Sequence, residues 1–274
     1  MLAAVPVLVL TWGAPEAWSG EAGYGQWAYG QDSRARLVAG PLLGSGQRVV
    51  GVQIELEPGW HTYWRFPGDS GVPPAFDWSG SVNAVDTAVE WPAPESIADD
   101  FGVSIGYTDE VVFPVVVTPR RAEETVSLAL ELDYAVCAQV CVPQRSALSL
   151  DIDPRQAASK DAVALVTSYR QRVPHRQTGS AAGPAIGGVT ATRDEGRVVL
   201  VVEATGEAPA ELYVEGPRPF YFSVARSGSA DATGQLKFVV NVDGAADPRD
   251  LDGAELTATL VSASGAVERS LIVQ

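Results

Sequence analysis

Residues 125–134 read TVSLALELDY, and every second side chain in this stretch is large and apolar. The apolar positions are Val126, Leu128, Leu130, Leu132 and Tyr134. A strict two-residue period indicates a β-strand with one buried and one solvent-facing side. Residues 49–57, VVGVQIELE, alternate in the same way. Both segments therefore predict strands of a sheet that covers an apolar core on one face.

Shorter apolar segments predict further strands. Pro and Gly punctuate the intervals between them, as at Pro58-Gly59 and Pro67-Gly68. Many short strands separated by turns favour an antiparallel sandwich. The acidic segment 98–110, ADDFGVSIGYTDE, is expected to be a solvated loop. The additional strands are predicted at 34–39, 60–65, 82–90, 111–117 and 146–152.

The pattern changes after Asp153. Residues 154–173 carry apolar side chains at helical spacing, which predicts a helix with Pro154 in its first turn. A linker rich in small residues follows, and strand patterns resume at about residue 186. The sequence therefore predicts an all-β protein with two antiparallel sandwiches. Strands of the second are predicted at 197–204, 211–214, 219–225, 235–242, 255–263 and 267–273.

The N-terminus, MLAAVPVLVL, is an apolar run too short to span a bilayer. It resembles the core of a secretory signal, with cleavage expected near Ala17-Trp18-Ser19. The expected division of the chain follows from these patterns. It comprises a signal segment at 1–20, a first sandwich with the cysteines at 30–153, a helix and linker at 154–185, and a second sandwich at 186–274.

The composition excludes several classes of function. The chain has 274 residues with a net charge of −15, from 34 acidic and 19 basic residues. Nucleic-acid binding is disfavoured, because phosphate contacts need clustered Lys and Arg. The sequence contains no nucleophile elbow, Walker loop or dinucleotide fingerprint. The cysteines are therefore the strongest candidates for chemistry.

Cys137 and Cys141 are the two cysteines of the chain, in the segment DYAVCAQVCVPQ. If the alternation of the preceding strand continues, Cys137 lies on the face opposite the core. A fully extended chain would hold the two Cα atoms about 13 Å apart. A disulfide needs a separation of about 4.4–6.8 Å. The chain must therefore reverse or coil between the cysteines.

Three roles are consistent with this pair. As a structural staple, a disulfide closing a five-residue loop would contribute only about 2 kcal/mol. A redox pair needs a short-range, accessible disulfide that opens without unfolding the domain, which agrees better with the sequence. Copper(I) could bind the two thiolates with or without His61. A closed zinc site is not expected, because His175 is the only other histidine.

Residues 59–80, GWHTYWRFPGDSGVPPAFDWSG, form the most aromatic stretch. Core packing, with GDSG as a β-turn, explains such a composition without any site. A second interpretation is a cap that shields the cysteines and docks a partner. The candidates for this cap or docking role are His61, Tyr63, Trp64, Asp69 and Tyr134.

Several motifs together resemble the periplasmic N-terminal domain of DsbD/ScsB-type protein-disulfide reductases. Residues 59–80 are followed in order by WPAPE, GYTDEVVFPVVV and the cysteine segment ending in CVP. The resemblance covers about residues 34–152 and is closest to ScsB, of the copper-sensitivity suppressor relatives. The region beyond 186 looks like the second sandwich of ScsB-like proteins.

This resemblance implies immunoglobulin-like sandwiches and a catalytic, exchanging pair formed by Cys137 and Cys141, with no cofactor or metal. It also implies that electrons come from a membrane-embedded reductase and pass to periplasmic thioredoxin-like proteins. The chain is accordingly expected to be exported, soluble and periplasmic, without stable membrane insertion. The alternative function is a copper(I)-handling periplasmic protein that uses the same cysteines. The three-residue gap is shorter than in better-known members, so the order of attack is not carried over.

Overall fold

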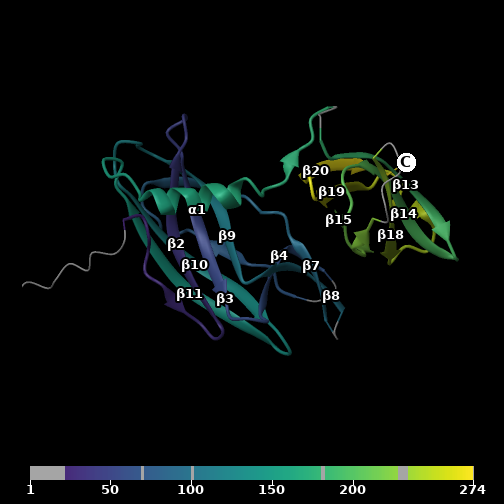
Figure 1. The fold of residues 1–274 in the computed structure, drawn as a ribbon, viewed down its shortest axis with the longest axis horizontal. Coiled ribbons are helices and arrows are strands. Elements are labelled where there is room, and N and C mark those ends of the chain that lie inside the picture. Colours follow the sequence, from purple (N-terminus) through teal and green to yellow (C-terminus); the bar gives the residue numbers. More distant parts are fainter. Residues whose placement is uncertain (1–21, 69–70, 100–101, 180–182, 228–233, 274) are drawn as a thin grey trace, which may run out of the picture.

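The computed structural model describes residues 22–68, 71–99, 102–179, 183–227 and 234–273. These residues form two immunoglobulin-like β-sandwiches, with one α-helix packed on the first (Figure 1). The predicted all-β fold is thus confirmed. The proposed signal segment at 1–20 and the candidate Asp69 lie outside the described residues.

The first sandwich consists of two antiparallel sheets. Its strands are β1 (Ala28–Tyr29), β2 (Ser33–Leu42), β3 (Arg48–Leu56), β4 (His61–Gly68), β5 (Ala75–Asp77), β6 (Ala84–Val89), β7 (Glu95–Asp99), β8 (Gly102–Thr108), β9 (Glu110–Pro119), β10 (Val126–Cys137) and β11 (Cys141–Ile152). One sheet has the order β1-β2-β3-β9-β6. The other has the order β11-β10-β4-β8-β7, with β5 paired to β10.

The alternation in β10 produces the predicted buried face. Its five even-numbered apolar residues from Val126 to Tyr134 are at most 4% exposed, whereas Glu131 is exposed. They pack with residues of the facing sheet such as Ile54 and Phe113 in one core. The strand continues to Cys137 and pairs residue for residue with β11. The partner strand consequently begins at Cys141, five residues before the predicted start at 146.

The described residues of the acidic segment 98–110 lie mostly in strands, at the end of β7 and in β8, so the expectation of a solvated loop was wrong. Its central part is β8, which lies between β4 and β7 in the sheet. Ile105 and Tyr107 share one face of β8 and are almost fully buried in the main core. Gly106 permits the close approach of β4: a Cβ atom there would lie 1.9 Å from the Thr62 carbonyl oxygen. The acidic residues at both ends concealed this buried strand.

The predicted helix is present but begins later than expected. It is α1 (Lys160–Arg170), and Ser159 caps it by accepting a hydrogen bond from the Ala162 amide. Pro154 therefore lies before the helix, because Ser159 is the N-cap residue that marks its first turn. The helix buries Ala162, Val166 and Tyr169. It packs against β2, β3 and β9, covering the outer face of the first sheet (Figure 1).

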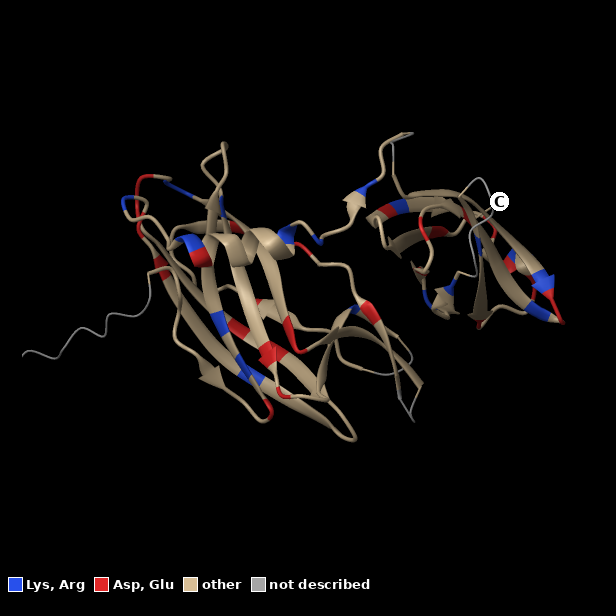
Figure 2. Cartoon of the chain, in the orientation of Figure 1, with Lys and Arg blue, Asp and Glu red and all other residues tan. Residues whose placement is uncertain are grey.

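The second sandwich has a separate core, built around residues such as Leu200, Phe238 and Leu260. Its sheets have the orders β12-β20-β19-β15-β17 and β13-β14-β18-β16. The predicted strand at 219–225 is divided into two short strands, β16 and β17. Acidic and basic residues are spread over both sandwiches (Figure 2). The elements are β12 (His175–Arg176), β13 (Ala185–Asp194), β14 (Arg197–Thr205), β15 (Ala210–Glu215), β16 (Tyr221–Phe222), β17 (Ala225–Arg226), β18 (Gln235–Asp243), the 3₁₀ helix η1 (Pro248–Leu251), β19 (Glu255–Ser262) and β20 (Gly265–Ile272).

We predict that Leu132→Ala lowers the free energy of unfolding of the first sandwich by about 2–5 kcal/mol, because it leaves a cavity in the core. The adjacent Glu131→Ala should change it by no more than about 0.5 kcal/mol, because that side chain faces solvent. Urea unfolding followed by tryptophan fluorescence measures both values. All 7 tryptophans precede residue 92, so the signal reports on the first sandwich. Equal losses in the two variants would contradict the assigned faces of β10.

Candidate functional site

The two cysteines form a disulfide at the tip of the β10–β11 hairpin. Cys137 and Cys141 are the last opposed pair of the ladder, with Cα atoms 4.1 Å apart. The intervening residues 138–140 make the turn, in which the Ala138 amide donates to the Val140 carbonyl oxygen at 3.2 Å. The predicted chain reversal is therefore confirmed, and it takes the form of a tight hairpin.

The two cysteines differ in their access to solvent. Cys137 is 2% exposed, although it lies on the predicted face, opposite the main core. It is buried because β4 adjoins β10 and Tyr63 covers it. Cys141 begins the edge strand β11 and is exposed. An incoming thiolate can therefore approach Cys141 more readily than Cys137.

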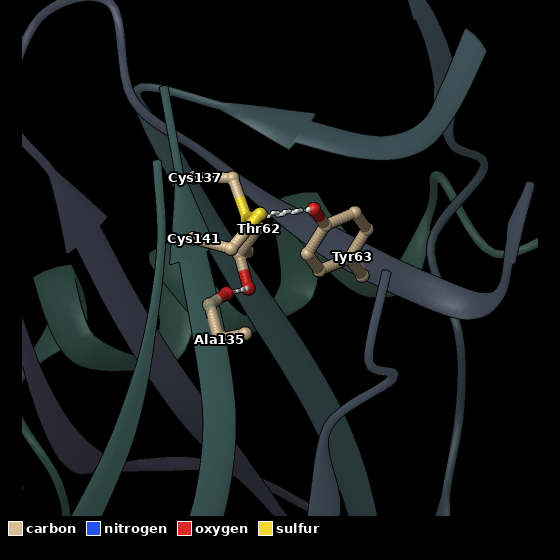
Figure 3. Close-up of a disulfide and its surroundings, with 5 residues drawn as sticks. All are labelled: Thr62, Tyr63, Ala135, Cys137 and Cys141. Carbon is tan, nitrogen blue, oxygen red and sulfur yellow. Dashed lines mark hydrogen bonds between the residues drawn. A yellow bond between two sulfur atoms is a disulfide. The ribbon is translucent and has the colours of Figure 1, made fainter. Parts of the chain in front are cut away.

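Tyr63 on β4 contacts both sulfur atoms. Its hydroxyl donates a hydrogen bond to Cys137 Sγ at 2.7 Å and lies 3.3 Å from Cys141 Sγ (Figure 3). Tyr63 is only 1% exposed, and the His61 ring packs against it edge to face, with centroids 5.4 Å apart. The hydroxyl is therefore held where it can interact with charge that develops on either sulfur.

A side-chain hydrogen bond fastens β4 to β10 beside the disulfide. The Thr62 hydroxyl donates to the Ala135 carbonyl oxygen at 2.9 Å (Figure 3). The backbone register between these strands pairs Cys137 with His61. The bond from Thr62, a fully buried residue, adds to that pairing. It fixes the backbone immediately before Tyr63, which supports the position of the tyrosine ring.

The ring of Tyr63 is covered by backbone from the end of the predicted GDSG turn. A Cβ atom on Gly71 would lie 2.3 Å from the Tyr63 ring, so the glycine backbone packs directly on it. Gly71 also has a φ angle of +141°, which favours glycine. The chain thus returns over Tyr63 soon after β4 ends at Gly68.

The structure brings together four of the predicted site residues: His61, Tyr63, Cys137 and Cys141. Trp64 belongs to the main core, because neighbouring residues of a strand point to opposite faces. The Tyr134 hydroxyl is buried in that core, 3.0 Å from Ser33 Oγ. Neither residue therefore lies beside the sulfurs. A cap or docking role for any of these residues stays a prediction.

Sequence reasoning missed Thr62 and Gly71. The Thr62 bond joins residues 73 positions apart, so its existence depends on the pairing of distant strands. Gly71 lies within a motif that is typical of a turn, and a turn by itself does not reveal what packs against it. The sequence offered one signal for Thr62: it is a polar residue between two aromatic ones, His61 and Tyr63.

Among the described residues, no cluster of three or more His, Cys, Asp or Glu is arranged to hold a metal ion. No helix in the described part of the chain has the length and apolar character needed to cross a membrane.

Comparisons with known proteins agree with this geometry. Residues 37–152 match the family described as thiol:disulfide interchange protein DsbD, N-terminal. The structure is similar to the crystal structure of the N-terminal periplasmic domain of ScsB from Proteus mirabilis, with a TM-score of 0.71 and 21% sequence identity. This similarity covers 92% of the present chain and 99% of the ScsB chain, so the shared fold extends over both sandwiches. No curated protein matched the sequence. The first sandwich, which carries the Cys137–Cys141 disulfide, therefore matches the DsbD N-terminal family over residues 37–152, and the chain shares the fold of the ScsB domain.

Proposed function

We propose that the first sandwich is a thiol–disulfide exchange module that relays electron pairs between other redox proteins. The observation that carries this proposal is the asymmetric disulfide, with Cys141 exposed and Cys137 covered by Tyr63. Such a bond is accessible to a partner, and it can open without disturbing the main core because it lies outside that core. The description of the matching family, thiol:disulfide interchange, supports the same chemistry.

In the proposed reaction the reduced pair donates two electrons to an oxidised partner. The Cys141 thiolate attacks one sulfur of the partner disulfide, and the partner's other sulfur leaves as a thiolate. The Cys137 thiolate then attacks Cys141 Sγ, which forms the intramolecular disulfide and releases the partner's first sulfur. In the reverse process one thiolate of a dithiol reductant attacks Cys141 Sγ, and Cys137 leaves as a thiolate. The second thiolate of the reductant then attacks the first, which forms the reductant's disulfide and releases Cys141 as a thiolate.

The proposed donor is a membrane-embedded disulfide reductase, and the proposed acceptors are thioredoxin-like proteins of the periplasm. The match of the first sandwich to the DsbD N-terminal family supports interaction with other redox proteins. The similar ScsB domain is described as periplasmic, and disulfides persist in that oxidising compartment. We propose the same location for this chain. The two cores also support the proposed division into sandwiches at 30–153 and 186–274.

The Tyr63 hydroxyl is proposed to stabilise the thiolate of the reduced pair. A hydrogen bond to the charged form of a group favours that form, so a donor beside the sulfurs lowers the pKa of the thiol. A lower thiol pKa increases the fraction of reactive thiolate near neutral pH. Tyr63 therefore has two expected roles: it covers Cys137 and it activates the pair.

We expect Cys137→Ala to accumulate a mixed disulfide with oxidised thioredoxin, because Cys141 can attack but no second thiol resolves the adduct. Cys141→Ala should form at least about tenfold less adduct, because burial restricts Cys137. Non-reducing electrophoresis with and without dithiothreitol measures the adducts. Absence of adducts in both variants, together with unfolding of the wild-type sandwich on reduction, would instead identify the disulfide as a structural staple.

Tyr63→Phe keeps the covering ring and removes the hydroxyl. We expect the pKa of the reactive thiol to rise and its alkylation at pH 7 to slow by about tenfold, the usual effect of losing a hydrogen bond to a charged group. The pH dependence of iodoacetamide alkylation of the reduced protein measures both quantities. Ser33→Ala, which removes the hydroxyl beside Tyr134, is the control and should leave the thiol pKa unchanged. An unchanged thiol pKa in Tyr63→Phe would exclude the activating role.

Copper(I) handling by the same cysteines is the second candidate function. The position of His61 directly across from Cys137 on β4 is the observation in its favour. Two thiolates with a nearby imidazole are ligands that copper(I) accepts. Titration of copper(I) against a competing chelator separates the two functions. Tight binding that is lost in Cys137→Ala, in a protein that exchanges with no thioredoxin, would favour the copper site.

A further inference from the structure

The part of β4 that follows Tyr63 pairs irregularly within its own sheet. The register between β4 and β8 passes from Tyr63↔Gly106 directly to Gly68↔Ser104. Four residues of β4, 64–67, therefore lie opposite one residue of β8. A bulge of this kind interrupts the regular ladder of backbone hydrogen bonds. The side chains of the segment therefore contribute to its position where the ladder is interrupted.

Two of those side chains, Trp64 and Arg65, contact the second sandwich. The Arg65 guanidinium donates two hydrogen bonds to Glu215 Oε1, at 2.6 and 3.1 Å, and one to Glu215 Oε2 at 3.1 Å. It also donates to Glu268 Oε2 at 2.5 Å. Glu215 ends β15 and Glu268 lies in β20, the two strands that flank β19. The adjacent Trp64 ring packs against Tyr213, with centroids 5.7 Å apart.

This ion-pair cluster is partly buried, so solvent and salt screen it less than an exposed salt bridge. The side chains of Arg65, Glu215 and Glu268 are 24%, 24% and 16% exposed. Burial by itself lowers the pKa of Arg65, but the two carboxylates outweigh it and the net pKa is raised. The guanidinium therefore stays charged, and its planar fork can bind one carboxylate in a bidentate manner.

A second set of contacts holds the neighbouring edge strand to the same sandwich. The Ser96 hydroxyl on β7 donates to Glu211 Oε1 at 2.5 Å and accepts from Arg226 at 2.6 Å. Arg226 in turn pairs with Glu211. The second sandwich thus binds the sheet at two places, on β4 and on β7, close to where β4 leaves the disulfide.

The segment held by Arg65 lies between two features of the redox site. Tyr63, two residues before Arg65, touches both sulfurs. Gly71, six residues after Arg65, packs on the Tyr63 ring. A displacement of residues 64–68 would move the tyrosine, the backbone that covers it, or both. The anchor at Arg65 is therefore well placed to keep the Tyr63 hydroxyl on the disulfide.

We propose that Arg65 is a positioning residue through which the second sandwich holds Tyr63 against the cysteines and so sets their reactivity. This inference rests on the proposed function: the position of Tyr63 affects disulfide exchange only if Cys137 and Cys141 carry out that exchange. It assigns the second sandwich a role in the chemistry of the first, although the second sandwich itself contains no cysteine.

The test uses the full chain with both carboxylates neutralised, Glu215→Gln with Glu268→Gln. In the reduced protein we expect the pKa of the reactive thiol to rise and alkylation at pH 7 to slow by roughly three- to tenfold, a usual range for coupled neighbours. In the Tyr63→Phe background the same two substitutions should have no further effect, because the hydroxyl that the Arg65 ion pairs position is absent. The matched control is Glu90→Gln, which breaks the ion pair with Arg170. Glu90 is about as exposed as Glu215, and its substitution should change neither the thiol pKa nor the alkylation rate.

Arg65→Lys provides a second variant, which keeps the charge but loses the bidentate fork; it should shift the thiol pKa in the same direction by a smaller amount. Circular dichroism and tryptophan fluorescence verify that each variant is folded. Two results would overturn the proposal. One is a wild-type thiol pKa in the folded Glu215→Gln/Glu268→Gln protein. The other is a combined variant with Tyr63→Phe in which alkylation is slowed by the full product of the separate effects. Iodoacetamide requires no protein partner, so the outcome is independent of whether Cys137→Ala traps thioredoxin. Failure of trapping would refute the proposed exchange function without altering the result on Arg65.

Discussion

The uninterrupted pairing of β10 with β11 is the constraint on which the rest of the site depends. Each of the 12 residues of β10 faces one residue of β11, and the last pair is Cys137 with Cys141. Because the ladder contains no bulge, the alternation that buries Leu132 and Val136 also places Cys137 on the other face. The same ladder brings the two Cα atoms to 4.1 Å, close enough for a disulfide.

The order of strands around this hairpin makes the two sulfurs unequal. β11 is an edge strand, so Cys141 has solvent beside it. β10 is an interior strand, so Cys137 has β4 beside it and is covered by Tyr63. A disulfide in a loop this small contributes little stability, about 2 kcal/mol. The arrangement is therefore better suited to a bond that opens and closes than to one that holds the fold together.

The second sandwich extends the network that surrounds the disulfide. The main core of the first sandwich includes Tyr213 from the second, which packs on Trp64. The next residue of β4, Arg65, is held by Glu215 and Glu268. Contacts of this kind couple a region without cysteines to the site that has them. They reach β4 at the point where its register with β8 is interrupted.

Local periodicity was enough to predict most strands, the buried face of β10, the helix and the face on which Cys137 lies. Prediction failed where local signals conflict, as in β8, whose acidic flanks hid a buried strand, and at Pro154, where Ser159 starts the helix instead. The surroundings of the sulfurs were not predictable in this way, because they come from contacts between distant strands. The contacts of Tyr63 with Cys137 and of Arg65 with Glu215 join residues 74 and 150 positions apart. Such contacts depend on strand order and on the packing of two sandwiches, and no short-range pattern records either.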